Sequence, residues 1–86
     1  MGTISYLNSN MFYFICEVFD EANNVVESYV RHYLHSDYLF NDALTVANTE
    51  ATEKFGKQEV KIINNNIMWF NWKVRPITGV EYSKHL

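Results

Sequence analysis

Only one stretch of this 86-residue chain has the apolar spacing of a helix, and this limits the folds open to the whole sequence. Its apolar residues recur three or four positions apart, at Phe40, Leu44, Ala47, Ala51 and Phe55. The pattern predicts an amphipathic helix that begins near residue 37, with Ser36 as its N-cap, and ends before Gly56. Weak helix formers in the middle of the segment leave a later start, near residue 49, as an alternative.

The segments on both sides of this helix are rich in β-branched and aromatic residues, which is typical of strands. Residues 10–19 and 25–34, joined by a turn that contains Asn23 and Asn24, predict an antiparallel hairpin. Residues 58–63 and 67–75, joined by three asparagines, predict a second pair of strands. The order ββαββ predicts a single α+β domain over residues 1–86: an antiparallel sheet of four to five strands with one helix on one face. Residues 1–9 and 77–86 are expected to be edge strands or flexible arms.

One helix can cover only one face of such a sheet, so we expect the other face to carry the functional residues. Alternation assigns Met68, Phe70, Trp72 and Val74 to the covered face of the last long strand. In residues 25–34 it assigns Val26, Val30 and Leu34 to the covered face, and Glu27, Tyr29, Arg31 and Tyr33 to the uncovered one. The predicted binding or interface residues on the uncovered face are Tyr13, Tyr29, Arg31, Tyr33, Trp69, Lys73 and Arg75.

The small size and the single cysteine limit how the domain can be stabilised. Cys16 has no partner for an internal disulfide, and the common structural zinc sites need at least two cysteines. Because so small a domain is marginally stable alone, we expect it to form a homo-oligomer. The chain has no apolar run near the ~18 residues of a membrane span and no recognisable leader, so we expect a cytoplasmic location.

Charge is distributed unevenly along the chain, which has a net charge of −3. Residues 1–53 carry eight acidic residues and one basic residue, whereas residues 54–86 carry six basic residues and two acidic ones. The net negative charge argues against general binding to double-stranded DNA. The asymmetry predicts attraction between the two halves, either within one chain or between subunits.

The residues that could support catalysis or metal binding do not form a recognisable motif. Cys16 and His32 on neighbouring strands could form a nucleophile and base, but Cys16 has the sequence surroundings of a buried apolar residue. His32 and His35 are three positions apart, which on a strand directs them to opposite faces and not to a shared metal ion. We therefore expect no catalytic residues, no metal and no cofactor, and we regard a small cysteine–histidine enzyme as the weakest hypothesis.

Two functions fit an exposed face of aromatic and cationic residues. Such residues are enriched in protein–protein interfaces, so the face could bind a second copy or a target protein. The same residues could instead stack the base of a nucleotide or of single-stranded nucleic acid while the cations hold phosphate.

In its general character the chain is similar to small accessory proteins of phages and mobile elements. It has fewer than 90 residues, is acidic and rich in Asn and Tyr, and has no catalytic motif. The resemblance implies a non-enzymatic inhibitor in the host cytoplasm, an antagonist of a host defence component that acts by occlusion or sequestration. It also implies the alternative of an oligomeric sponge for a signalling nucleotide. No site residue is assigned by the resemblance.

Overall fold

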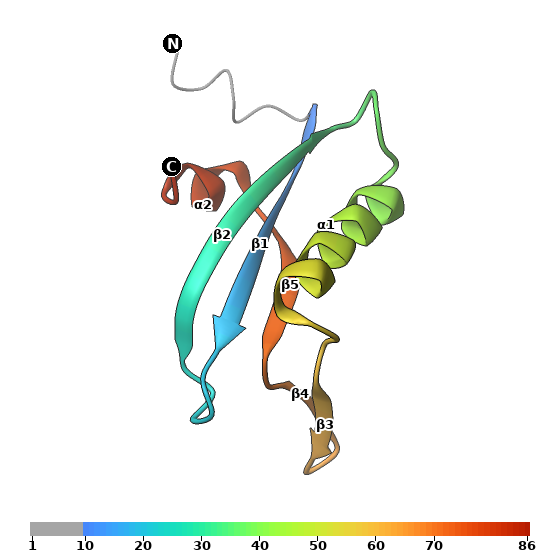
Figure 1. Ribbon diagram of the computed structural model, residues 1–86. Coiled ribbons are helices and arrows are strands. Elements are labelled where there is room, and N and C mark those ends of the chain that lie inside the picture. Colours follow the sequence, from blue (N-terminus) through green and yellow to red (C-terminus); the bar gives the residue numbers. More distant parts are fainter. Residues whose placement is uncertain (1–9) are drawn as a thin grey trace.

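The computed structural model describes residues 10–86 and shows an α+β fold in which strands predominate (Figure 1). The possible edge strand or arm at residues 1–9 lies outside the described residues. The elements in chain order are β1 (Met11–Phe19), β2 (Val25–Leu34), α1 (Phe40–Phe55), β3 (Val60–Ile63), β4 (Asn66–Trp69), β5 (Trp72–Ile77) and α2 (Gly79–Ser83).

The main sheet has three antiparallel strands in the order β2-β1-β5. The strand β1 is central because it is apolar on both faces, and Phe14, Ile15 and Cys16 are all buried. The predicted hairpin of β1 and β2 is confirmed. In its turn, the Asp20 carboxylate accepts hydrogen bonds from two backbone N–H groups, and Asn23 adopts a positive φ of 65°.

The helix α1 begins at Phe40, between the two starts that the sequence allowed. Ser36 is therefore not its N-cap; Leu39 occupies that position and makes no side-chain capping bond. The helix ends at Gly56 as predicted, where φ is 85°. Three alanines, at Ala43, Ala47 and Ala51, are fully buried and let the helix lie close to the sheet.

The weak helix formers in the middle of α1 are accommodated by side-chain hydrogen bonds. Each of three polar side chains donates to the carbonyl four residues earlier; they are Thr45, Asn48 and Thr52. These bonds keep the polar side chains satisfied on the helix surface. The segment stays helical because its face of Ala43, Ala47 and Ala51 is buried against the sheet.

The predicted strand over residues 67–75 is broken at Asn71, and this overturns the sheet of four to five strands. The Asn71 Oδ1 atom accepts hydrogen bonds from the N–H groups of Glu59 and Trp72 at 2.7 and 2.9 Å, and its Nδ2 donates to the Lys57 carbonyl at 2.8 Å. The chain changes direction there. Residues before the break pair with β3 in a separate two-stranded sheet, and residues after it join β1.

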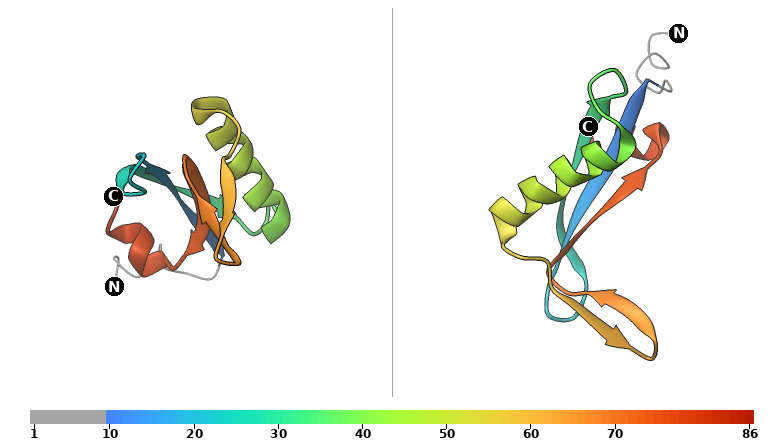
Figure 2. Two further views of the ribbon diagram at one scale, coloured as in Figure 1. Left: turned by 90° about the horizontal axis from the view of Figure 1, so that it is seen from below. Right: turned by 90° about the vertical axis from the view of Figure 1, so that its right-hand side faces the viewer.

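We call this two-stranded sheet, residues 60–69, the arm. Its turn at Asn64 and Asn65 has two positive φ angles, 53° and 65°, as a two-residue hairpin turn with the right twist requires. The arm projects beyond the main sheet at the end where the β1–β2 turn lies (Figure 1 and Figure 2).

The second face of the main sheet is partly covered, contrary to the expectation of a bare face. Residues 79–83 form α2 instead of an edge strand or flexible arm, and Thr78 caps this helix by accepting a hydrogen bond from the Glu81 N–H. The two helices lie on opposite sides of the sheet (Figure 2). The Tyr82 ring packs on Tyr13 with centroids 4.6 Å apart, and Ile15 beside it is 2% exposed.

The core on the other face centres on Trp72, which is 1% exposed and packs with Cys16 and Ala51. Its indole N–H donates to the Gly56 carbonyl at 2.9 Å, so the ring joins β5 to the end of α1. Of the four residues predicted to face the helix, Trp72 and Val74 pack in this cluster, whereas Met68 lies in β4 and Phe70 precedes the break at Asn71.

The two tryptophans provide a matched test of this core. We expect Trp72→Phe to lower the free energy of unfolding by about 1–3 kcal/mol, because it removes a buried hydrogen bond and leaves a partly filled space. Trp69→Phe, in the arm, should cost less than about 0.5 kcal/mol. Urea unfolding followed by circular dichroism measures both. Equal losses in the two variants would contradict the assignment of Trp72 as the core residue.

Candidate functional site

The side chains predicted to share one uncovered face are divided among three places. Tyr29, Arg31 and Tyr33 lie on the helix side of β2, and Tyr13 and Arg75 lie on the side of α2. Trp69 belongs to the arm, where the Lys73 Nζ lies 5.3 Å from the centre of its ring.

The assignment of faces on β2 was wrong by one residue. Cys16 pairs with Tyr29 and Phe14 pairs with Arg31, and cross-strand partners point to the same side of a sheet. The helix side therefore receives Tyr29 and Arg31, while Val30 lies on the side of α2. A strand with apolar or aromatic residues at both odd and even positions does not specify which of the two sets faces the helix. A shift of one residue in the pairing moves every side chain to the other face of the sheet.

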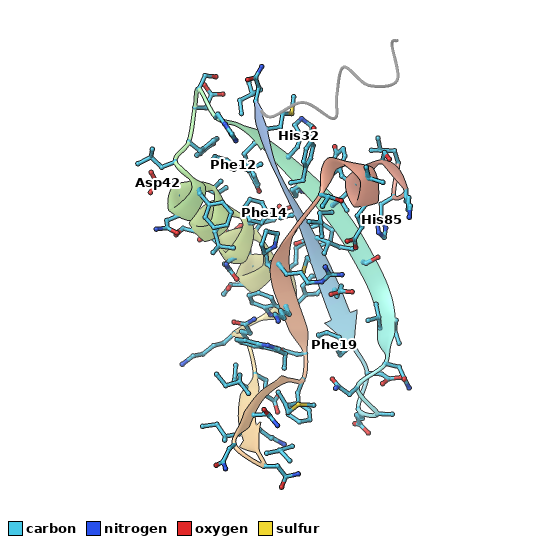
Figure 3. The ribbon with its side chains drawn as sticks, turned by 180° about the vertical axis from the view of Figure 1, so that it is seen from behind. Phe12, Phe14, Phe19, His32, Asp42 and His85 are labelled. Carbon is cyan, nitrogen blue, oxygen red and sulfur yellow. The ribbon has the colours of Figure 1, made fainter. Side chains whose placement is uncertain are left out.

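A half-buried cluster of tyrosines with one arginine lies between β2 and α1, and we call it the β2 rim. Its members are Tyr29, Arg31, Tyr33 and Tyr38. The helix packs on β5 and β1, as the buried cluster of Trp72, Cys16 and Ala51 shows, and leaves the outer strand β2 only partly covered. Figure 3 shows Phe12 and Phe14 pointing from β1 toward α1, and both rings pack on Phe40 of that helix.

Arg31 is the fixed centre of the β2 rim. Its Nε and Nη2 atoms donate to the two carboxylate oxygens of Glu50 on α1, at 2.9 and 2.6 Å. Its Cζ atom lies 4.4 Å from the centre of the Tyr29 ring, and Lys54 Nζ lies 4.5 Å from the same ring. A bidentate ion pair and two cation–π contacts hold these side chains in one arrangement.

The other two members extend the rim toward the β2–α1 connection. The Tyr33 and Tyr38 rings meet edge to face with centroids 5.4 Å apart, and Tyr33 also packs on Phe14 at 5.9 Å. Sequence reasoning missed Tyr38, because it placed this residue in the first turn of a helix that begins near residue 37. The available signal was the pair Tyr38-Leu39, an aromatic and an apolar residue directly after the polar residues Ser36 and Asp37.

The electrostatics of the rim follow from these contacts. The hydrogen bonds from Arg31 hold the pKa of Glu50 below its ordinary value of 4.5. Burial raises the pKa of Tyr33 and, more strongly, that of Tyr29, whose buried hydroxyl also interacts with the Cys16 thiol. Both tyrosines therefore remain neutral, and the only charges of the rim are Arg31 and its neighbours Glu50 and Lys54.

Two of the other predicted site residues serve internal contacts. Arg75 donates to Glu17 at 2.9 Å and to Glu81 at 3.2 Å, and so joins β5 to β1 and to α2. Tyr13 is 7% exposed beneath Tyr82. Tyr13 is therefore closed to a ligand, whereas the Arg75 side chain is 37% exposed but is not grouped with the tyrosines of β2.

The candidates for catalysis and metal binding are separated by the sheet. Cys16 is 3% exposed on the helix side, whereas His32 lies on the other side, where its Nδ1 is 2.7 Å from the Tyr82 hydroxyl. His35 stacks on the Phe12 ring, with centroids 3.9 Å apart. Across residues 10–86, no three His, Cys, Asp or Glu side chains are grouped so that they could hold a metal ion.

A groove of about 540 Å³ separates the β1–β2 turn from the arm. It is lined by Phe19, Asp20 and Glu21 on one side and by Glu59, Lys61 and Phe70 on the other. Lys61 lies over the Phe70 ring, 4.8 Å from its centre. With three carboxylates against one ammonium group, the groove attracts cations and repels phosphate.

No protein-family model, no curated protein and no solved structure matches the chain. Neither helix in the described part of the chain is long and apolar enough to cross a membrane.

The Arg31–Glu50 pair predicts a pH dependence of stability. A carboxyl group whose pKa is lower in the folded state stabilises the fold above its unfolded pKa, and this contribution is lost as the pH falls through the folded value. Because both side chains are partly exposed, Glu50→Gln should cost about 1 kcal/mol or less at pH 7. This cost should shrink as the pH falls below 4.5, the ordinary value for a glutamate. Glu53→Gln, exposed on the same helix, is the control; a cost that does not change with pH would contradict the assignment.

The buried thiol predicts slow modification of the native protein. Burial raises the pKa of Cys16, so little reactive thiolate is present near neutral pH. We expect Ellman's reagent to modify Cys16 at least ~10-fold more slowly in the native protein than in the urea-unfolded chain. Equal rates at the same pH would show instead that the thiol is accessible.

Proposed function

We propose that this chain is a non-catalytic binding protein that covers a surface of a target protein with its β2 rim. The observation that carries the proposal is the fixed, partly exposed arrangement of Arg31 among Tyr29, Tyr33 and Tyr38. Tyrosine and arginine are enriched among the residues that dominate binding energy at protein interfaces. Three of the side chains predicted as binding residues, Tyr29, Arg31 and Tyr33, belong to this cluster.

Preorganisation supports the same function. A long side chain normally loses conformational entropy when a complex forms, at a cost of about 0.5–1.5 kcal/mol. Arg31 is already held by Glu50 and lies over Tyr29, so much of this loss has occurred before a target binds. Its remaining surface, with a side chain 38% exposed, is available to a carboxylate or carbonyl group of the target.

The biological setting that we propose is antagonism of a host defence protein in the host cytoplasm, by a phage or mobile-element product. Its support is the similarity in size, acidity and composition to such accessory proteins. In this setting the mechanism is occlusion: the rim occupies a surface that the host protein needs for its own activity.

Nucleotide sequestration is the alternative function, and cations over aromatic rings favour it. Lys61 over Phe70 and Lys73 over Trp69 provide the required chemical groups. However, the adjoining groove contains three carboxylates, which oppose a phosphate ligand. Thermal shift with cyclic dinucleotides, ADP-ribose derivatives and a single-stranded oligonucleotide separates the two proposals, because only the alternative predicts a rise in melting temperature.

The proposal is tested by crosslinking from the β2 rim. A photoreactive phenylalanine at Tyr38 should crosslink a discrete protein in a bacterial host lysate. The same group at Thr49, exposed on α1, should not. Crosslinking of the same proteins from both positions would contradict specific recognition by the rim.

Affinity for the captured protein then tests the role of Arg31. Arg31→Ala should weaken binding by about 10- to 30-fold, as expected for a residue that dominates an interface. Lys84→Ala removes the same charge from the exposed C-terminal segment and should leave binding unchanged. Because Arg31 also pairs with Glu50, circular dichroism must show that the variant remains folded. An Arg31→Ala variant that is folded and binds as tightly as the unchanged protein would overturn the proposal.

A further inference from the structure

One face of the arm consists entirely of apolar side chains. The cross-strand pairs Val60 with Trp69 and Ile62 with Ile67 point to the same side of β3 and β4. Ile62 is 74% exposed, Ile67 is 59% exposed and Val60 is 43% exposed. An isolated two-stranded hairpin is marginally stable in water, and exposed apolar surface of this kind marks an interface.

The β1–β2 turn has the surface that complements this face. Val25 and Val26 are 49% and 62% exposed, and acidic residues adjoin them at Asp20, Glu21 and Glu27. At the base of the arm, Lys73 lies beside the apolar face, with its Nζ 5.3 Å from the centre of the Trp69 ring, whereas Lys61 pairs with Met68 and points to the opposite face. The apolar face of the arm is thus bordered by a cation, and the apolar residues of the turn are bordered by carboxylates.

These two surfaces do not cover each other within one chain. The groove of about 540 Å³ lies between the turn and the opposite face of the arm, which carries Lys61, although the Phe19 N–H donates to the Asn71 carbonyl at the base of the arm. Both surfaces lie at the same end of the molecule (Figure 1 and Figure 2). A two-fold axis at that end would therefore bring the arm of each copy to the turn of the other and close the assembly.

The size of the arm favours a second copy over a single target peptide. Each strand of the arm has four residues and spans about 13 Å, at ~3.3 Å per residue. A stable interface needs roughly 800 Å² on each partner, which one face of so short a ribbon does not supply. A reciprocal contact uses each arm and each turn, and so doubles the buried area.

We propose that two copies of this chain form a two-fold dimer in which the arm of each copy packs its apolar face against the acidic β1–β2 turn of the other. Val60, Ile62, Ile67 and Trp69 supply the apolar contact from the arm, and Val25 and Val26 supply it from the turn. Lys73, beside Trp69, and the carboxylates of the turn fix the orientation. This contact uses residues other than those of the β2 rim.

The first test compares opposite charges at one exposed position of the arm. Sedimentation velocity should show the unchanged protein as a dimer at micromolar concentration. Ile62→Asp should weaken the dimer at least tenfold, because the new carboxylate would face the acidic turn. Ile62→Lys should weaken it less, since its ammonium group would face the same carboxylates. Val80→Asp, at a 57% exposed position on α2, is the control and should leave the dimer intact.

The second test uses the reciprocity of the contact. A variant with Glu21→Lys and Glu27→Lys carries a basic turn. Mixed with Ile62→Asp, it should form a heterodimer, because the aspartate arm would meet the lysine turn while the other contact remains native. A monomeric unchanged protein at high micromolar concentration would overturn the proposal, as would equal effects of Ile62→Asp and Val80→Asp or the absence of the heterodimer. Each of these results leaves the function proposed for the β2 rim standing, because that function is tested by Arg31 and Tyr38.

Discussion

The amide side chain of Asn71 is the interaction on which the arrangement of this fold depends. It satisfies the N–H groups of Glu59 and Trp72 and the carbonyl of Lys57, where a continuous strand would satisfy its backbone groups by pairing with a neighbour. Because of this replacement, the chain leaves the arm and enters β5 within two residues. The same turn places Trp72 beneath α1, so the core and the projecting arm have a common origin.

The parts of the fold that the sequence predicted are those with a strong local pattern. The spacing of the alanines and Gly56 predicted the end of α1, and the asparagines of the β1–β2 turn predicted the hairpin. The continuous apolar run of β1 predicted a buried strand, which is now seen at the centre of the sheet. Each of these features is decided by neighbours within a few residues, which is the range over which sequence patterns act.

The features that the sequence did not predict depend on distant contacts. Nothing local distinguishes Asn71 from an asparagine in a strand; its partners at Lys57 and Glu59 lie more than ten positions away. The same is true of α2, which stands where an edge strand was expected because Tyr82 packs on Tyr13 across the sheet. On β2, only the pairing with β1 decides whether Tyr29 or Val30 faces the helix.

On β2 the predicted face was wrong, but three of the predicted site residues still lie together. Tyr29, Arg31 and Tyr33 were grouped because alternation places them on one side, and this remains true when the side is exchanged. What made them a surface is the position of α1, which covers the central and β5 strands and leaves β2 at its edge. Trp69 and Lys73 were separated from them by the break at Asn71.

The two proposed surfaces have consistent physical roles. The β2 rim is anchored to the core by Phe14 and Glu50, so its geometry is fixed before a target arrives, as recognition requires. The arm has little support from its own chain and a wholly apolar face, so it gains most from a partner.

In a two-fold dimer joined at the arms, the two β2 rims remain outside the contact. Two rims on one particle then raise the apparent affinity for a target that presents its site more than once. An 86-residue domain without a disulfide would in this way gain stability and avidity from a single association.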